Sequence, residues 1–513
     1  MNSMPQTLET SALRYFDGLS KDELIKYYHL AHKEINERVS QCIQVETIET
    51  QNFDVIQEEI DQSIQNLTLS LIQYDLDKQN YLSKYKNIFE FAHFYDVNDT
   101  IYEQSVTLGH PFHPMTKTKL GLSTDEVICY APEFRNSVKI IPLICEASNV
   151  ETIGEYVLPE NYTEQLRDIA SKLEINHPAF VFVHEWQLNH YIKQHNSDLL
   201  INGVCIPIYQ LAVEAHPLLS FRTLYVPEFN CVIKTAVNAQ ATSAVRNVSQ
   251  ASIQNGITLS KYVSEIYKEY DGCFIQQDKA GMSLRSAEHN NKISCMIRET
   301  IQRRENQDVL VCASLITKSF ITDQPMIHEA IDLISDKQQI SQEEAIKLFF
   351  TKYAKLLIEA TYRLMLEHHI SLEAHMQNSS VVLEDGMPVA IYIRDFGGVR
   401  LSNKEIDIDC STGLYTESFE ALHAVFTHAV LYNHLFQMIE TLQISDKRAL
   451  YQVIYKEIES INNNFKPKVN VLKAPVLKVK SLLKMRLYGD SYDYRYSSIN
   501  NPLFSEVFQC GKK

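Results

Sequence analysis

The sequence lacks any apolar run that approaches the ~20 residues a membrane-spanning helix needs. Its first residues, "MNSMPQTLETSALRYF", also lack the basic and then apolar pattern of a secretory signal. No internal repeat or low-complexity segment is visible. We therefore expect a cytoplasmic, folded protein that does not enter a membrane.

Closely spaced pairs of cysteines are absent from the sequence as well. Ten cysteines are scattered along the chain, with no CxxC pair and no spacing typical of a zinc site. We expect reduced thiols, most of them buried.

The chain has no excess of positive charge, because the formal net charge of its 513 residues is −16. This balance argues against a nucleic-acid-binding protein and against binding to anionic membranes. The content of 28 tyrosines and 22 phenylalanines, with 45% hydrophobic residues, indicates a globular protein. This length allows about two to four domains.

Helical patterns dominate both ends of the chain. Two of the patterned segments begin with a capping box, Ser20 with Glu23 and Ser341 with Glu344. Apolar residues then recur at helical spacing. The predicted helices are 20–39, 341–370, 416–442 and 447–461.

The middle of the chain has short β-rich runs between turn residues, at 179–187, 220–226 and 230–237. Residues 380–398 predict a hairpin with Asp385-Gly386 at its turn. We predict an α+β fold with a sheet-rich centre and a helical C-terminal domain that carries this hairpin. The expected domains are 1–155, 156–335 and 336–513.

Residues 109–121, "GHPFHPMTKTKLG", combine backbone breakers with cationic groups. The prolines after His110 and His113 disfavour a helix there, so we expect an extended or turning segment. Lys117 and Lys119 point the same way if the chain stays extended. The loop then offers up to four cationic groups to a polyanionic ligand. The alternative is a solvated basic loop, or histidines that bond to the backbone.

Residues 220–249 interleave cations with small hydroxyls on predicted strands and loops. This mixture suits phosphate and carboxylate oxygens, because arginine offers a bidentate fork and hydroxyls donate with little steric demand. An ordinary charged surface strand is the alternative. The candidate binding residues are Ser220, Arg222, Lys234, Thr242, Ser243 and Arg246.

Oxygen ligands follow the long predicted helix and end the hairpin. "EAHMQN" contains Glu373, His375 and Asn378, and "IRDFGG" contains Asp395. Glu373, Asn378 and Asp395 together offer the hard oxygen ligands that Mg²⁺ prefers. For each residue taken alone, the alternative is a structural role, either at a capped helix end or as an aspartate in a turn. A further motif, "VHEWQ" at 183–187, contains the only tryptophan and fits a buried core position better than a site.

The order of these ligands resembles that of protein kinases only in part. Glu373 stands five residues before Asn378, and Asp395 begins an Asp-Phe-Gly triplet. The HRD triplet, the GxGxxG loop and a VAIK-type lysine in the expected order are missing. We infer that the protein binds ATP together with Mg²⁺. The identity of the acceptor substrate stays open.

The motifs taken together resemble those of the NRPS-independent siderophore synthetases, the aerobactin-synthetase-like (IucA/IucC-type) family. The resemblance covers residues 105–505 and rests on "GHPFHPMTKTKLG", "HEWQ", "TSAVR", "EAHMQN", "RDF" and "KSLLKMRL" with "NPL", in this order. Glu185, Lys119 and Asn247 depart from the family, which usually has proline, arginine and threonine there.

The resemblance implies a cupped hand of three domains, with a thumb at 1–155, fingers at 156–335 and a palm at 336–513. It implies adenylation of a carboxylate, citrate or a citrate derivative, by ATP with Mg²⁺. An amine, hydroxylamine or alcohol then captures the acyl group and releases AMP. A homodimer fits the family. A small-molecule kinase and a non-catalytic nucleotide-binding relative are the alternatives.

The resemblance also implies roles for individual residues. His113, Lys117 and Lys119 would face the nucleotide or the acyl group, and Lys234 and His375 would lie near the reacting carboxyl. Glu373, Asn378 and Asp395 would hold Mg²⁺. Phosphate and carboxylate oxygens would contact Ser220, Arg222, Thr242, Ser243 and Arg246.

Overall fold

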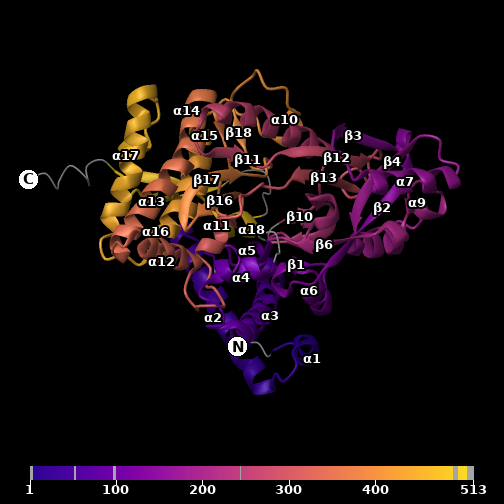
Figure 1. The fold of residues 1–513 in the computed structure, drawn as a ribbon, viewed down its shortest axis with the longest axis horizontal. Helices are drawn as coiled ribbons and strands as arrows, with labels where there is room; N and C mark the ends of the chain where they lie inside the picture. Colours follow the sequence, from indigo (N-terminus) through magenta and orange to yellow (C-terminus); the bar gives the residue numbers. More distant parts are fainter. Residues whose placement is uncertain (1–3, 51–52, 96–99, 243, 489–494, 505–513) are drawn as a thin grey trace, which may run out of the picture.

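The computed structural model describes residues 4–50, 53–95, 100–242, 244–488 and 495–504. Figure 1 shows three groups of elements around a centre: N-terminal helices at the bottom, a large sheet at the right and long helices at the left. The predicted mixture of helices and sheets is confirmed. The domain limits at 155 and 335 stay a prediction.

The N-terminal group is helical. Its second helix, α2, begins at the predicted capping box, where Glu23 N donates to Ser20 Oγ (3.3 Å) and Ser20 N donates to Glu23 Oε2 (2.9 Å). The helices are α1 (Gln6–Tyr15), α2 (Lys21–Glu46), α3 (Gln57–Tyr81), α4 (Ile88–Tyr95), α5 (Thr100–Gln104) and α6 (Thr124–Tyr130).

The large sheet has nine strands in the order β3-β12-β13-β8-β7-β6-β2-β4, with β5 on the side of β2. All its pairs are antiparallel. The strands are β2 (Val138–Glu146), β3 (Val150–Gly154), β4 (Pro178–His184), β5 (Ile206–Pro207), β6 (Val213–Pro217), β7 (Thr223–Val226), β8 (Cys231–Thr235), β12 (Asp278–Leu284) and β13 (Ser294–Glu299). Its helices are α7 (Glu160–Lys172), α8 (Glu185–Gln187), α9 (Asp198–Ile201) and α10 (Gln250–Ile266).

The predicted runs at 179–187, 220–226 and 230–237 each contain a strand of this sheet, but the first one ends early. Residues 185–187 form a helical turn because His184 Nδ1 accepts the backbone N–H of Trp186 (3.0 Å). That bond caps the turn and ends the strand.

A four-stranded sheet in the order β11-β17-β16-β14 lies against the long C-terminal helices. The predicted hairpin is confirmed as β16 and β17, with Asp385 and Gly386 at positive φ in its turn. The strands are β11 (Cys273–Ile275), β14 (Gln307–Val311), β16 (Ser379–Glu384) and β17 (Met387–Ile393). The helices are α11 (Cys312–Leu315), α12 (Met326–Gln338), α13 (Gln342–Ile358), α14 (Leu364–His368), α15 (Phe419–Val425), α16 (Gln437–Leu442) and α17 (Lys447–Phe465).

The predicted helices at 341–370 and 416–442 are confirmed, and each contains a π-helical segment, Glu359–Arg363 and Phe426–Phe436. The capping box of Ser341 and Glu344 begins α13. Smaller elements complete the fold: β1 (Lys119–Leu120), β9 (Val237–Ala241), β10 (Ala244–Arg246), β15 (Ile370–Ser371), β18 (Arg400–Leu401), β19 (Val476–Lys480), α18 (Leu482–Leu487) and β20 (Tyr496–Asn500).

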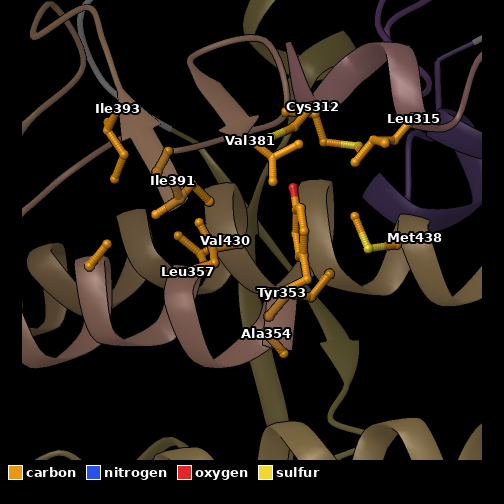
Figure 2. Packing of buried hydrophobic residues seen from close by; sticks show 14 of the residues in the cluster. Cys312, Leu315, Tyr353, Ala354, Leu357, Val381, Ile391, Ile393, Val430 and Met438 are labelled. Atoms are coloured by element: carbon orange, nitrogen blue, oxygen red, sulfur yellow. The ribbon is translucent and has the colours of Figure 1, made fainter. Parts of the chain in front are cut away.

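A buried tyrosine links the helical core to a loop that carries candidate site residues. Tyr353 of α13 is fully buried and points from its helix toward Val381 of the sheet, as Figure 2 shows. Its hydroxyl lies 2.5 Å from His434 Nε2, and His434 Nδ1 lies 2.8 Å from the carbonyl oxygen of Ala374. The core therefore holds the "EAHMQN" loop in place.

The nine described cysteines are free thiols, and seven of them are buried. This confirms the expectation of reduced, mostly buried thiols. Within the described ranges, no helix combines the length and the apolar character needed to cross a bilayer.

Candidate active site

A cavity of about 450 Å³, here called the central cavity, lies between the three groups of elements. Its walls come from segments that are far apart in the sequence: 103–119, 132–133, 219–298 and 373–398. His113 lies outside the lining, and Ser243 lies outside the described residues. Eleven of the thirteen predicted site residues line the cavity: Lys117, Lys119, Ser220, Arg222, Lys234, Thr242, Arg246, Glu373, His375, Asn378 and Asp395.

Helix α3 holds the basic loop against one wall of the cavity. Ser63 Oγ donates to the carbonyl oxygen of Pro114 (2.9 Å), and Asn66 Nδ2 donates to that of Lys117 (2.7 Å). These bonds satisfy the backbone of a non-helical segment, as the prolines predict. The loop is therefore a rigid part of the wall.

The two lysines of this loop share a buried carboxylate. Lys117 Nζ lies 3.0 Å from Glu133 Oε1, and both side chains are buried. Burial acts to raise the pKa of Glu133, but Lys117 and Lys119 outweigh it and lower that pKa to about 2. Burial, the largest influence on Lys119, lowers its pKa to about 8. One wall thus carries two ammonium groups against one carboxylate.

The expectation of up to four cationic groups in this loop is wrong for its histidines. Burial is the main cause that lowers the pKa of His113 to about 3 and that of His110 well below its ordinary value. His113 Nδ1 also accepts the backbone N–H of Met115 (3.2 Å). Both imidazoles are neutral near pH 7, so the histidine alternative, bonding to the backbone, describes His113 better.

His375 lines the cavity with its ring centroid 6.3 Å from that of His110. Burial lowers the pKa of His375, and its Nδ1 accepts the backbone N–H of Gln377 (3.2 Å). With Nδ1 accepting, Nε2 carries the proton in the neutral ring. His375 is therefore a neutral donor oriented by its own backbone.

Two arginines of the lining, Arg222 and Arg246, have no carboxylate bound to them within the part of the chain that the structure describes. Arg222 Nη1 donates to the carbonyl oxygens of Arg246 and Asn247, each at 2.9 Å. The Nε atoms of Arg222 and Arg246 are buried and have no hydrogen-bond partner among the described residues. Burial lowers the pKa of Arg222 to about 9 and lowers that of Arg246. Buried guanidinium groups with unused donors favour an anionic ligand.

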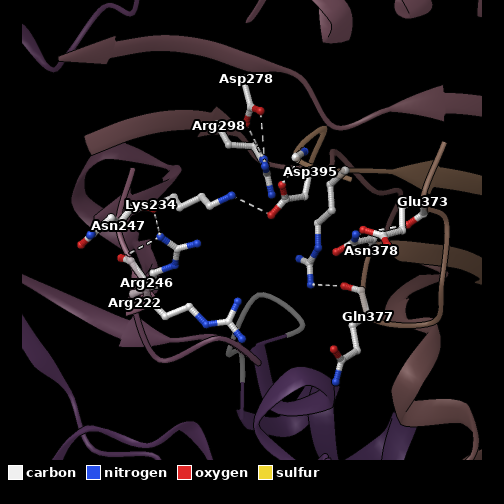
Figure 3. Close-up of polar contacts among 12 residues, drawn as sticks. Arg222, Lys234, Arg246, Asn247, Asp278, Arg298, Glu373, Gln377, Asn378 and Asp395 are labelled. Carbon is white, nitrogen blue, oxygen red and sulfur yellow. Dashed lines mark hydrogen bonds and ion pairs between the residues drawn. The ribbon is translucent and has the colours of Figure 1, made fainter. Parts of the chain in front are cut away.

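Lys234 of β8 reaches across the cavity to Asp395, which follows β17. Figure 3 shows Lys234, Arg222 and Arg246 on one side and Asp395, Glu373 and Asn378 on the other. Lys234 Nζ lies 2.6 Å from Asp395 Oδ2. The cavity therefore has a cationic wall and a carboxylate wall that meet at this pair.

Two residues of the lining have an unusual backbone. Asp395 has a φ of +66° and Thr242 a φ of +58°. Positive φ is disfavoured for residues with a Cβ, above all for β-branched ones such as threonine. Such strain is concentrated at functional sites, where the surrounding structure holds it.

Two carboxylates and one amide form the candidate magnesium site. Glu373 is paired with Lys480, while Asn378 Nδ2 donates to the carbonyl oxygen of Glu373 (3.2 Å). Burial acts to raise the pKa of Glu373, but Lys480 outweighs it and lowers that pKa. The carboxylate of Glu373 also lies over Gly398, where an added Cβ would collide with it.

This donor set fits magnesium only together with a phosphate ligand. Among the described residues, no group of three or more His, Cys, Asp or Glu side chains could hold a metal ion by itself. Mg²⁺ is commonly bound by one or two carboxylates plus substrate phosphates. Glu373, Asn378 and Asp395 supply such a partial set.

Several charged residues of the lining were missed by sequence reasoning. Arg298 Nε lies 2.7 Å from Asp278 Oδ1, and Arg394 is bound through both terminal nitrogens to Glu103. Lys480, which lies outside the lining, is bound to Glu373. No local pattern predicts these pairs, because each pair joins different strands or loops. Only Arg394, in the motif "IRDFGG", and Lys480, at the start of "KSLLKMRL", lie in motifs that the sequence had marked.

The "VHEWQ" motif lies in the core, as expected. His184, Trp186 and Gln187 are buried and do not line the central cavity. The indole Nε1 of Trp186 donates to Glu126 Oε1 (3.1 Å), and the ring stacks on His190. These contacts hold α6 against the sheet.

Comparison with known families finds two matches in different parts of the chain. The IucA / IucC family matches residues 99–317, and the family described as ferric iron reductase FhuF-like transporter matches residues 347–495. The first match spans the basic loop and the cationic wall. The second spans the "EAHMQN" loop and Asp395.

Curated relatives are similar over most of the chain. Staphyloferrin A synthase of Staphylococcus aureus is 29% identical over 80% of this chain and 74% of its own length. D-ornithine–citrate ligase of the same organism is 24% identical over 91% of this chain and 79% of its own length. Spermidine-citrate ligase of Bacillus anthracis is 24% identical over 66% of this chain and 60% of its own length.

Solved structures share the fold at low identity. ATP-bound aerobactin synthetase IucA of Klebsiella pneumoniae superimposes with a TM-score of 0.76 at 17% identity, over 93% of this chain and 87% of that one. The petrobactin biosynthesis protein AsbB of Bacillus anthracis has a TM-score of 0.73 at 19% identity, over 90% and 80%.

Proposed function

The chain belongs to the IucA/IucC family of NRPS-independent siderophore synthetases, and we propose that it joins citrate or a citrate derivative to an amine, hydroxylamine or alcohol with ATP. The observation that carries this proposal is the convergence of Lys119, Lys234, Arg222 and Arg246 from distant segments in one cavity. Such a concentration of positive groups in an acidic protein suits two polyanionic substrates.

The first step forms an acyl-adenylate. A carboxylate oxygen of the acid attacks the α-phosphorus of ATP, the bond from phosphorus to the pyrophosphate oxygen breaks, and pyrophosphate leaves. Citrate and ATP together carry about seven negative charges, so positive groups are required to bring oxygen and phosphorus together. We assign this role to Lys117, Lys119, Lys234, Arg222 and Arg246. The hydroxyls of Ser220 and Thr242 add neutral donors.

Magnesium would be held by Glu373, Asn378 and Asp395 together with phosphate oxygens of ATP. When bound there, it supplies charge neutralisation at the phosphates. Lys480 and Lys234 keep the two carboxylates ionised and oriented.

The second step transfers the acyl group. The nucleophile, for example an amine nitrogen, attacks the acyl carbon, the bond from that carbon to the phosphate oxygen breaks, AMP leaves, and the nitrogen releases a proton. We assign His375 to the reacting carboxyl, where its Nε2–H stabilises the oxygen that becomes negative during attack. Released protons pass to water in the open cavity.

The cupped-hand description is part of the same proposal. The N-terminal helices would form the thumb (1–155), the nine-stranded sheet the fingers (156–335) and the C-terminal helices the palm (336–513). A cavity lined by all three groups of elements supports this division.

One experiment tests the proposed reaction. The full-length protein is incubated with citrate and Mg·ATP, and nucleotides and pyrophosphate are measured with and without D-ornithine or spermidine. We expect citrate-dependent pyrophosphate release, and AMP with an amide product when a suitable amine is present. ADP without pyrophosphate would identify a kinase instead. If neither citrate nor any other carboxylate tested in its place supports turnover, the protein is a non-catalytic relative.

A further inference from the structure

A second cavity, of about 320 Å³ and here called the side cavity, lies next to the central cavity. The two cavities share two lining residues, Glu103 and Arg394. Arg394 Nη1 and Nη2 donate to the two carboxylate oxygens of Glu103 at 2.5 and 2.9 Å, and Leu219 N donates to Glu103 Oε2 at 3.0 Å. A buried, bidentate ion pair thus separates the cavities.

Both cavities lie over the same face of the nine-stranded sheet. Side chains two positions apart on a strand share a face, and such a step spans about 7 Å. Residues of the central cavity have neighbours two positions away on the same strand that line the side cavity: Lys234 with Val232 on β8, and Thr223 with Tyr225 on β7. A ligand in the side cavity therefore lies one such step from the Lys234–Asp395 pair.

The side cavity offers an acceptor with no partner. Gln276 is 5% exposed, and its Oε1 is buried without a hydrogen-bond partner among the described residues. Its Nε2 donates to the carbonyl oxygen of Glu299 (2.9 Å), and this bond fixes the orientation of the amide. The amide oxygen of Gln276 can then accept a hydrogen bond from a ligand. Leu218, Tyr225 and Val232 form a small apolar cluster in the same lining. An aliphatic ligand that carries N–H donors matches both features.

We propose that the side cavity binds the nucleophile of the reaction, an aliphatic amine, with its chain over the apolar cluster and an amino group at Gln276 and Glu103. This inference rests on the proposed function and names the place of its second substrate. The carboxylate of Glu103 faces both cavities, so an amino group held there is directed toward the acyl-adenylate. Arg303, the other arginine of the lining, donates from Nη1 to the carbonyl oxygen of Gln307 (2.9 Å).

The test compares large and small nucleophiles on variants of the side cavity. Gln276→Leu removes the unpartnered acceptor at nearly constant volume, and Gln302→Trp narrows the exposed rim without touching a buried group. D-ornithine, spermidine and L-2,3-diaminopropanoate serve as amines, while hydroxylamine serves as a nucleophile too small to need the cavity. For both variants we expect at least a tenfold fall in amine capture relative to hydroxamate formation by the same protein.

Asn306→Trp is the matched control, because Asn306 lies in the same loop as Gln302 but outside the lining. It should leave the ratio of amine capture to hydroxamate formation unchanged. Equal losses with amines and hydroxylamine, or no loss, would overturn the inference. So would a wild-type protein that forms the hydroxamate but captures none of the three amines. Absence of carboxylate-dependent pyrophosphate release in the wild type would instead overturn the proposed function.

Discussion

Lys234 Nζ lies 2.6 Å from Asp395 Oδ2, although the two residues are 161 positions apart in the chain. The pair joins the nine-stranded sheet to the hairpin of the four-stranded sheet across the central cavity. Burial acts to raise the pKa of Asp395, but Lys234 and Arg298 outweigh it and hold that pKa well below its ordinary value. Asp395 is therefore a permanent anion among cations.

Asp395→Asn is expected to lower citrate-dependent pyrophosphate exchange by about 100-fold or more, because it removes a charge that orders the site. The Mg²⁺ concentration for half-maximal rate should rise, since Asp395 is one of three proposed ligands. Asp385→Asn is the matched control, because Asp385 lies at the surface turn of the same hairpin. An unchanged magnesium titration in Asp395→Asn would refute the ligand assignment.

Arg246→Ala is expected to reduce kcat/KM for citrate by about 100-fold while changing the free energy of unfolding by about 1 kcal/mol or less. The reason is that Arg246 Nε has no partner among the described residues, so its loss breaks few contacts. Thermal melting and pyrophosphate exchange measure the two effects. Arg167→Ala, at an exposed position of α7, should change neither. A variant with full activity and early melting would contradict the assignment of Arg246 to substrate binding.

Lys119 is expected to impose an alkaline limit on activity. Burial lowers its pKa to about 8, so the free enzyme loses this positive charge above that pH. The kcat/KM for the anionic substrates should then fall above pH 8 in the wild type. Lys119→Arg should keep its charge and extend activity to higher pH. Identical pH profiles of the two proteins would show that Lys119 does not act on the substrates.

The same lysine predicts an opposite trend in stability. Between the folded-state pKa of about 8 and the ordinary value of 10.5, the unfolded chain binds the proton that the folded chain has released. The contribution of Lys119 to the free energy of unfolding therefore rises with pH in this window. Urea unfolding of the wild type and Lys119→Arg at pH 8 and pH 10 measures the difference, which should grow with pH.

Neighbouring glycines provide a test of how Glu373 is positioned. An alanine Cβ at Gly398 would collide with the carboxylate of Glu373, whereas at Gly397 the nearest atom is Asp395 Oδ1 at 3.5 Å. We expect Gly398→Ala to lower pyrophosphate exchange at least tenfold and Gly397→Ala to stay close to the wild type. Equal activity of the two variants would show that the position of the Glu373 carboxylate is not critical.

Local features were predictable from the sequence because their interactions span only a few residues. The capping boxes at Ser20 and Ser341 close hydrogen bonds over three positions, and Asp385-Gly386 satisfies its turn by itself. The segments that line the central cavity were also identified, since their unusual residue types are grouped in short motifs. These features need no knowledge of the tertiary structure.

Charge states and long-range pairs were decided only by the fold. His110 and His113 are neutral because the chain around them is packed against α2, where Arg38 donates to the carbonyl oxygen of His110 (2.7 Å). Glu103 and Arg394, 291 positions apart, meet only after the N-terminal helices and the hairpin have packed together. The sequence alone determined which chemical groups are available and where helices begin and turns occur. The tertiary structure decided which groups lose their water and which charges meet, because desolvation and Coulomb energies depend on distances that no local pattern encodes.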